Sequence, residues 1–206
     1  MIGPRTLRAL WRDDAGSSAV EFALVFVLLI LVTFGSVEAG LMLWQWNSAE
    51  KATQEGVRHA AVHDLVAPGL RSIGSEPLSG GDYGDWCRDR TTGAVNADCW
   101  FAPVTCTSAS CSGGQGFSAT AFAAIVARMR AVFPLVEAEN VEVAYVFSGL
   151  GFIGRPGGQP MMVTVRLRNM RYQFFVLNAF TSLPDVIPLP AFAATLVGED
   201  MSDSPL

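Results

Sequence analysis

The chain has 206 residues and a formal net charge of −5, from 14 basic and 19 acidic residues. Half of its residues are hydrophobic and only 16% are charged, which excludes a wholly disordered chain. The acidic balance provides no electrostatic basis for nucleic-acid binding. An apolar excess with so few charges instead predicts a segment that lies in a membrane.

That apolar excess is concentrated near the N-terminus. The segment from Phe22 to Val37 carries no charge, and as a helix it would span about 24 Å. Apolar residues resume after Glu38 and continue to Trp46, which predicts a transmembrane helix over 17–46 with tryptophans at its far interface. The alternative is a buried core helix of a soluble protein.

The charges that flank this segment predict its orientation. Arg5, Arg8 and Arg12 precede it, whereas the residues that follow it are mainly acidic. Because Lys and Arg near a membrane helix stay in the cytoplasm, the rest of the chain is expected to be exported.

All four cysteines fall in the part that is expected to be exported: Cys87, Cys99, Cys106 and Cys111. An oxidising compartment and an even number of cysteines predict two disulfides, with three possible connectivities. A zinc site is the weaker alternative because no CxxC pair is present. The cysteines lie in a Gly/Ser-rich loop, 68–117, which is expected to lack regular structure and to be stapled by the disulfides. Its exposed tip is a candidate contact for a subunit or another partner.

Two sites of proteolytic processing are possible near the helix. Val37, Glu38 and Ala39 form a small-x-Ala pattern, and signal peptidase cutting there would release residues 40–206 as a soluble domain. The apolar segment is longer than in ordinary signal peptides and continues past this position. The other site lies between Gly16 and Ser17, before the apolar segment.

The residues around Gly16 resemble a known family. Residues 15–24 read AGSSAVEFAL, a long apolar segment follows, and residues 34–40 read FGSVEAG. This is similar to the TadE-like family of tight-adherence pilus assembly proteins, which are pseudopilins related to type IVb pilins. The family pattern is a short basic leader, a glycine, four small or apolar residues, a glutamate, a phenylalanine and a run of aliphatic residues.

The resemblance implies that a prepilin peptidase removes a cytoplasmic leader, 1–16, by cutting between Gly16 and Ser17. It also implies that Glu21 and Phe22 contact other subunits during assembly. The new α-amine of Ser17 would lie four residues before Glu21, on the same helix face. Alternatively, Glu21 simply marks the edge of the membrane.

The same resemblance implies a single-pass protein of the bacterial cytoplasmic membrane, with its N-terminus in the cytoplasm and its C-terminal domain exported. The expected partners are the prepilin peptidase, other pilus or pseudopilin subunits, assembly-platform proteins and the lipid bilayer.

After the membrane span, the helix is expected to continue outside the membrane over 47–67. A stripe of mostly small residues predicts that it packs closely on a sheet or on another helix. The stripe consists of Ala49, Thr53, Gly56, Ala60 and Ala67. His59 and His63 have the i,i+4 spacing of a metal pair, but no third ligand accompanies them, so no metal site is predicted.

The exported domain is expected to extend over 118–206. Ser118 should cap a helix that reaches Val132, and strands are expected over 140–147, 161–168 and 171–177. Residues 191–197 could form a strand or a short helix. The predicted fold class is therefore α+β: a long N-terminal helix packed on a small antiparallel sheet, as the pilin resemblance implies.

The sequence shows no nucleophile–base–acid set, so neither an enzyme nor a bound cofactor is expected. We interpret the chain as a membrane-anchored TadE-like minor pseudopilin that assists assembly of a tight-adherence (Flp, type IVb) pilus. The alternative is a single-pass or secreted envelope domain that binds a partner without entering a filament. N-terminal sequencing would distinguish the two.

Overall fold

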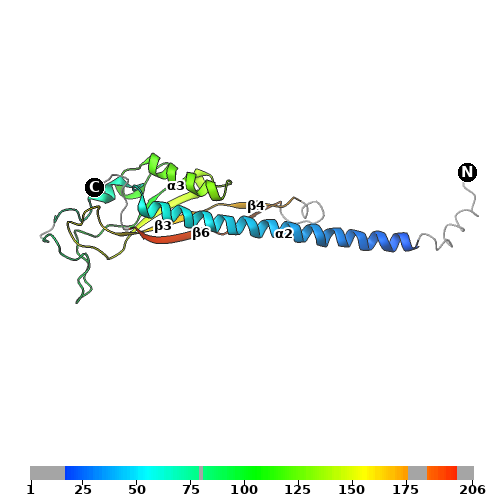
Figure 1. The fold of residues 1–206 in the computed structure, drawn as a ribbon, viewed down its shortest axis with the longest axis horizontal. Coiled ribbons are helices and arrows are strands. Elements are labelled where there is room, and N and C mark those ends of the chain that lie inside the picture. The colour runs from blue at the N-terminus through cyan, green and yellow to red at the C-terminus, as the bar shows by residue number, and fades with distance from the viewer. Residues whose placement is uncertain (1–16, 79–80, 176–184, 199–206) are drawn as a thin grey trace, which may run out of the picture. The chain divides into compact units, whose positions relative to one another are not determined.

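The computed structural model describes residues 17–78, 81–175 and 185–198. The helices are α2 (Ser17–Val62) and α3 (Ala119–Val132), with 3-10 turns η2 (Pro68–Ser72), η3 (Ser112–Gly114) and η4 (Ala138–Asn140) (Figure 1). The strands are β1 (Val104–Cys106), β2 (Val141–Phe147), β3 (Met161–Leu167), β4 (Arg171–Gln173), β5 (Val186–Pro188) and β6 (Phe192–Gly198). The predicted α+β class, with a long N-terminal apolar helix and an antiparallel sheet, is confirmed.

The chain divides into two compact units, and each is described here by itself. The N-terminal unit consists of residues 1–44 and 172–187, and the main unit consists of residues 45–171 and 188–206. Both include some residues outside the described ranges. The long helix α2 contributes to both units.

The core of the main unit lies on one face of a four-stranded antiparallel sheet. Its strand order is β1-β2-β3-β6, with Val143 opposite Val165 on the central pair. Buried residues alternate with more exposed ones along β3, as expected for a sheet with one covered face. The strands predicted over 140–147 and 161–168 therefore exist, each one residue shorter than expected.

The second half of α2 packs against this sheet and against α3 through small residues. Ala49, Thr53 and Ala60 are at most 1% exposed. A β-carbon placed on Gly56 would contact side chains of both α3 and β3, so the glycine allows the three elements to approach closely. The predicted packing of the small-residue stripe is confirmed for these members.

Helix α2 ends earlier than predicted, at Val62 rather than near 67. The main-chain groups of Val66 are instead used in tertiary contacts: its N–H donates to the Tyr145 hydroxyl at 3.0 Å, and its carbonyl accepts from the N–H of Ser118 at 2.8 Å. The first of these bonds satisfies an N–H that a longer helix would have paired internally, and the second satisfies a carbonyl that would have been unpaired in its last turn.

Helix α3 follows its prediction closely. The Ser118 hydroxyl accepts a hydrogen bond from the N–H of Ala121 at 3.3 Å, which caps the first turn. Its inner face consists of Phe122, Ile125, Val126 and Met129, all buried. This spacing of three and four residues is that of an amphipathic helix.

Two segments differ from the sequence-based expectation, and the structure decides a third that the sequence did not. The loop 68–117 contains β1, which pairs with β2 at the edge of the sheet. The strand predicted over 171–177 is the three-residue β4, which pairs with β5 in a separate two-stranded sheet; residues 176 and 177 lie outside the described ranges. The segment 191–197, left open between helix and strand, corresponds to β6, which pairs with β3.

Candidate membrane and assembly site

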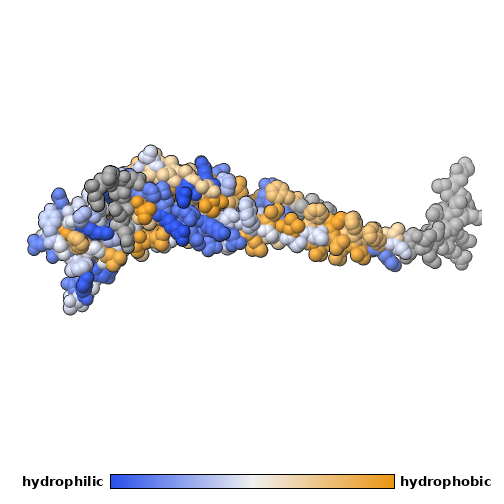
Figure 2. Space-filling view, viewed as in Figure 1, coloured by the Kyte–Doolittle hydropathy of each residue, from blue (hydrophilic) through white to orange (hydrophobic). Residues whose placement is uncertain are grey.

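The first half of α2 presents apolar side chains in every direction. Within the described part of the chain, α2 is the one helix long and apolar enough to cross a membrane, and none of its most apolar window is buried. Figure 2 shows the hydrophobic colour concentrated along this part of the helix. In water such a surface would be unfavourable, whereas hydrocarbon solvates it on all sides.

Two hydroxyl groups lie within this apolar segment, and both are satisfied inside the helix. The Thr33 hydroxyl donates to the carbonyl oxygens of Leu29 or Ile30, at 2.9 and 3.0 Å. The Ser36 hydroxyl donates to the carbonyl oxygen of Thr33 at 2.8 Å. These bonds make the polar atoms compatible with lipid, where water is not available as a partner.

The residues predicted to act in processing and assembly lie at the start of this helix. Gly16 lies outside the described residues, and Ser17 is the first residue of α2. Glu21 is exposed one turn later. Phe22 is 69% exposed, with its ring centroid 5.6 Å from that of Phe26. The roles assigned to these residues remain predictions.

Glu38 is a functional candidate that the sequence analysis missed. It is only 3% exposed, although it lies on the apolar helix. Its carboxylate accepts a hydrogen bond from the N–H of Phe175, and its main-chain oxygen accepts one from the Tyr172 hydroxyl at 3.0 Å. A lone carboxylate in an apolar segment requires such a partner. The need for a partner could have been inferred from the sequence, but the sequence alone did not indicate that Tyr172 and Phe175 supply it.

The main unit contains two disulfides, so the predicted oxidation of the cysteines is confirmed. Cys87 pairs with Cys99 and Cys106 with Cys111. The structure thus selects the sequential connectivity from the three that the sequence allowed. Cys106 lies on β1, so the second disulfide ties the edge of the sheet to the turn that follows.

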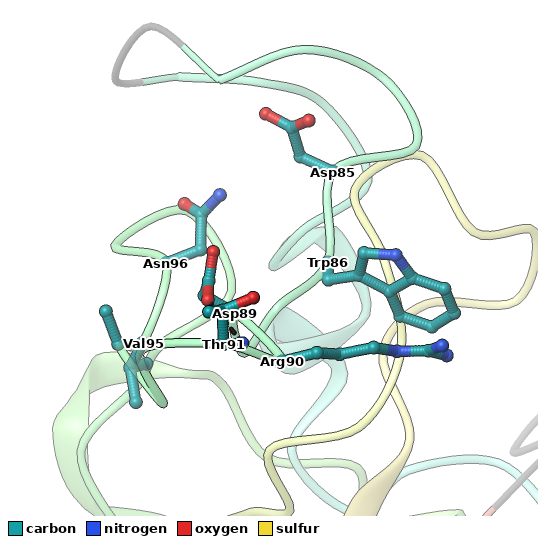
Figure 3. A pocket seen from close by; sticks show the side chains of 8 residues that line it. Asp85, Trp86, Asp89, Arg90, Thr91, Val95 and Asn96 are labelled. Atoms are coloured by element: carbon teal, nitrogen blue, oxygen red, sulfur yellow. Dashed lines mark hydrogen bonds between the residues drawn. The ribbon is translucent and has the colours of Figure 1, made fainter.

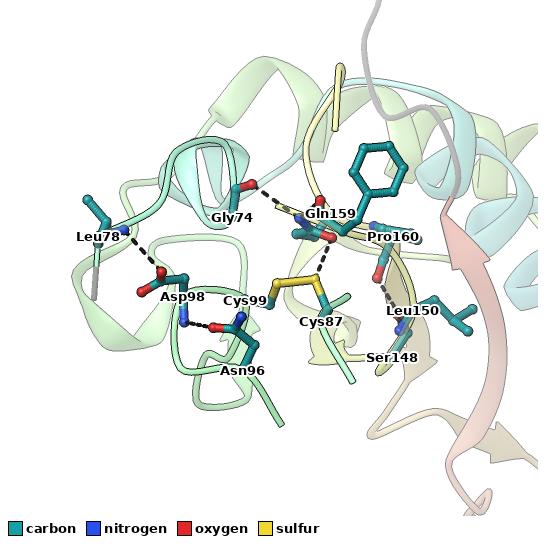
Figure 4. The surroundings of a disulfide bond; sticks show 11 residues. Gly74, Leu78, Cys87, Asn96, Asp98, Cys99, Ser148, Leu150, Gln159 and Pro160 are labelled. Atoms are coloured by element: carbon teal, nitrogen blue, oxygen red, sulfur yellow. Dashed lines mark hydrogen bonds between the residues drawn. A yellow bond between two sulfur atoms is a disulfide. The ribbon is translucent and has the colours of Figure 1, made fainter. Parts of the chain in front are cut away.

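The Cys87–Cys99 disulfide is attached to the rest of the unit through a buried glutamine (Figure 4). The Gln159 amide donates to the carbonyl oxygens of Gly74 at 3.2 Å and Phe152 at 2.7 Å. Its oxygen lies 3.0 Å from Cys87 Sγ, as a contact rather than a hydrogen bond because a disulfide sulfur carries no proton. The N–H of Cys87 also donates to the carbonyl of Gly151 at 3.1 Å. These contacts connect one end of the loop closed by this disulfide to Gln159 and Gly151.

A polar cavity of about 500 Å³ opens in the same loop (Figure 3). Asp85, Asp89 and Asn96 contribute polar side chains to its lining. The N–H groups of Thr92 and then Thr91 bond to the Asp89 carboxylate and hold its pKa below the ordinary value. The Asp85 carboxylate likewise accepts a hydrogen bond from the N–H of Asp82, so both carboxylates of the lining bond to main-chain groups of local turns.

Beside this cavity, the guanidinium of Arg90 lies 3.9 Å from the ring centroid of Trp86. Trp86 is half exposed. Trp and Arg are enriched among the residues that dominate binding at protein interfaces. The pair and the cavity lie in the loop whose exposed tip the sequence analysis named as a candidate contact for a partner, and that role stays a prediction.

The two histidines at the C-terminal end of α2, His59 and His63, contact each other directly. The rings of His59 and His63 stack with centroids 3.7 Å apart, and His63 Nδ1 lies 2.9 Å from the His59 carbonyl oxygen. Among the residues that the structure describes, no group of three or more His, Cys, Asp or Glu side chains is placed to hold a metal ion.

With this geometry established, comparison with known proteins adds one finding. Residues 16–58 match the family model described as TadE-like protein. The N-terminal segment is therefore similar to that family, and the match confirms the resemblance inferred from the residues around Gly16. It begins at Gly16 and covers most of α2, leaving the rest of the main unit outside. No curated protein and no solved structure matches the chain.

Proposed function

We propose that this protein is a membrane-anchored minor pseudopilin that assists assembly of a tight-adherence (Flp, type IVb) pilus. The observation that carries the proposal is the coincidence of two features on one segment. The TadE-like match spans residues 16–58, and the same segment contains the exposed apolar helix that can act as a membrane anchor.

In this proposal, a prepilin peptidase cuts between Gly16 and Ser17, and the new α-amine lies one helical turn before Glu21. Within one subunit this spacing places the two groups on the same face. A carboxylate at the edge of the hydrocarbon is costly and gains from a cationic partner. The amine of a neighbouring processed subunit is such a partner, so Glu21 would contribute to subunit association, with Phe22 packing beside it.

The continuity of α2 supports an anchored protein over a soluble secreted one. The helix extends without a break through Ala39 and Gly40. A signal peptidase cut at that point would separate Glu38 from Tyr172 and Phe175, which bond to it. Retention of the whole helix keeps these contacts. The single-pass envelope domain that does not enter a filament remains the alternative function.

Substitution of Glu21 tests the proposal. Glu21→Ala should leave leader removal and membrane insertion intact, because it makes the helix more apolar. Co-purification with other pilus subunits from detergent-solubilised membranes should be lost, because a charge-assisted contact is removed. Glu21→Asp should be partly defective, since its carboxylate reaches less far.

Glu50→Ala is the matched control, because Glu50 is an exposed glutamate of the same helix in the main unit. It should co-purify with the other subunits at the wild-type level. If Glu21→Ala also does so, Glu21 has no role in assembly and the alternative function is favoured.

A further inference from the structure

We propose that α2 leaves the membrane at Glu38 and that the Tyr172–Phe175 segment lies in the outer headgroup region of the bilayer. The partner of this surface is a lipid bilayer. The proposal rests on the membrane anchor in the proposed function and adds a second, non-helical contact with the membrane. It also shortens the span predicted over 17–46.

The first step is that the charge of Glu38 is covered. Glu38 is the only charged residue from Phe22 to Trp46. Its carboxylate accepts the N–H of Phe175, and the residue is 3% exposed. Because the chain itself covers this carboxylate and hydrogen-bonds to it, the residues around it can enter the headgroup layer without bringing an unpaired charge with them. The Tyr172 side chain, 3% exposed, completes this cover.

The second step is length. The helix from Ser17 to Val37 rises about 31 Å at 1.5 Å per residue. The hydrocarbon core of a bilayer is about 30 Å thick. A span that begins at Ser17 therefore reaches the outer edge of the hydrocarbon at Glu38, and the next two turns fall in the headgroup region.

The third step is what surrounds Glu38. Phe175 is 74% exposed, and Leu41, Leu43 and Trp44 of the helix are 50 to 61% exposed. Successive helix positions point 100° apart, so these three side chains spread over about 160° of the helix surface, whereas Glu38 and Gln45 lie on its covered side. A broad exposed apolar surface of this kind is well solvated by lipid. Trp is also enriched at membrane interfaces.

Depth-dependent quenching tests this placement. All four native cysteines are in disulfides, so a single introduced cysteine carries the only thiol of the chain. Phe175→Cys in the full chain is labelled with a polarity-sensitive thiol dye and reconstituted into phosphatidylcholine vesicles. Lipids brominated close to the headgroup should quench the label several-fold more strongly than lipids brominated near the acyl terminus.

Two further positions serve as matched controls. A label at Leu28→Cys, on an exposed residue of the apolar helix, should be quenched by deeply brominated lipid. A label at Leu78→Cys, on a residue of the main unit that is 78% exposed, should be quenched by aqueous iodide and not by either lipid.

The outcomes separate this proposal from the proposed function. If the Leu28 label responds to deeply brominated lipid but the Phe175 label is as accessible to iodide as the Leu78 label, the membrane anchor stands and the interfacial contact is wrong. Quenching of the Phe175 label mainly by deeply brominated lipid also overturns the contact. If the Leu28 label does not respond to brominated lipid, the membrane anchor itself fails.

Discussion

Gly56 of α2 lies directly against Met129 of α3: a β-carbon on Gly56 would come 2.8 Å from Met129 Cγ and 3.3 Å from Val165 Cγ1. Gly56→Leu should therefore destabilise the main unit by about 1–3 kcal/mol, because overpacking forces its neighbours to move. Gly56→Ala should cost less, because Met129 is flexible and alanine regains about 1 kcal/mol of helix propensity. Urea unfolding of the full chain in detergent measures both effects.

Gly40 provides the control on the same helix. A β-carbon there meets nothing within 4 Å, so Gly40→Ala should leave the urea midpoint unchanged or slightly raised. If Gly56→Leu unfolds at the wild-type midpoint, the close contact between α2 and α3 does not exist.

Because the Tyr145 hydroxyl is buried, we expect the free energy of unfolding to fall at alkaline pH. Burial raises its pKa from 10.0 to about 12, although the N–H of Val66 donates to its oxygen and partly offsets the shift. Below pH 10 the hydroxyl is neutral in the folded and unfolded states. As the pH rises from 10 towards 12, the unfolded state loses its proton first, so the free energy of unfolding should fall.

Tyr145→Phe should remove this part of the pH dependence. It should also cost about 1–3 kcal/mol near neutral pH, because the N–H of Val66 loses a buried acceptor. Tyr83→Phe, at an exposed position, should retain the alkaline loss. An identical pH profile for wild type and Tyr145→Phe would show that Tyr145 is not the group responsible.

The two disulfides should contribute unequally to stability. The Cys87–Cys99 pair is separated by 12 positions and the Cys106–Cys111 pair by 5. Loop-closure entropy then predicts losses of about 3 kcal/mol for the Cys87→Ser/Cys99→Ser variant and about 2 kcal/mol for the Cys106→Ser/Cys111→Ser variant. Chemical denaturation compares them.

Peptide mapping without reduction tests the pairing itself. Each sequential pair should appear as a linked peptide, and the intact protein should weigh four hydrogens less than its reduced form. Four free thiols in protein taken from its native compartment would contradict both the pairing and the exported topology.

Sequence patterns predicted the parts of the fold that depend on local periodicity. The apolar segment of α2, the Ser118 cap of α3 and the alternation along β3 each follow from residues close together in the chain. The small-residue stripe also indicated a packed face, although it did not identify α3 and the sheet as the elements that meet there.

The features that were missed depend on distant partners. Strand β1 has three residues in a Gly/Ser-rich loop, and only its pairing with β2 makes it a strand. The burial of Glu38 depends on Phe175, which lies 137 positions later. The main-chain groups of Val66, just past the early end of α2, likewise bond to distant residues, Tyr145 and Ser118. Patterns among residues that are close together in the chain do not indicate such contacts.

Processing should depend on the small size of residue 16. Gly16→Leu should block leader removal, because a glycine allows the peptidase close access to the main chain. Gly40→Leu should be processed normally, since it lies well beyond the proposed site. Immunoblotting of membranes would show the unprocessed Gly16→Leu chain as a larger species. Normal processing of that variant would mean that the site is wrongly assigned.

The most direct test of the central claim is N-terminal sequencing of the mature protein from native membranes. Cutting after Gly16 removes three arginines and two aspartates, so 190 of the 206 residues remain and the formal net charge changes from −5 to −6. The account predicts a first residue of Ser17 in a protein that stays in the membrane fraction. A mature chain that begins at Gly40 in the soluble fraction, or an uncut chain that begins at Met1, would contradict it.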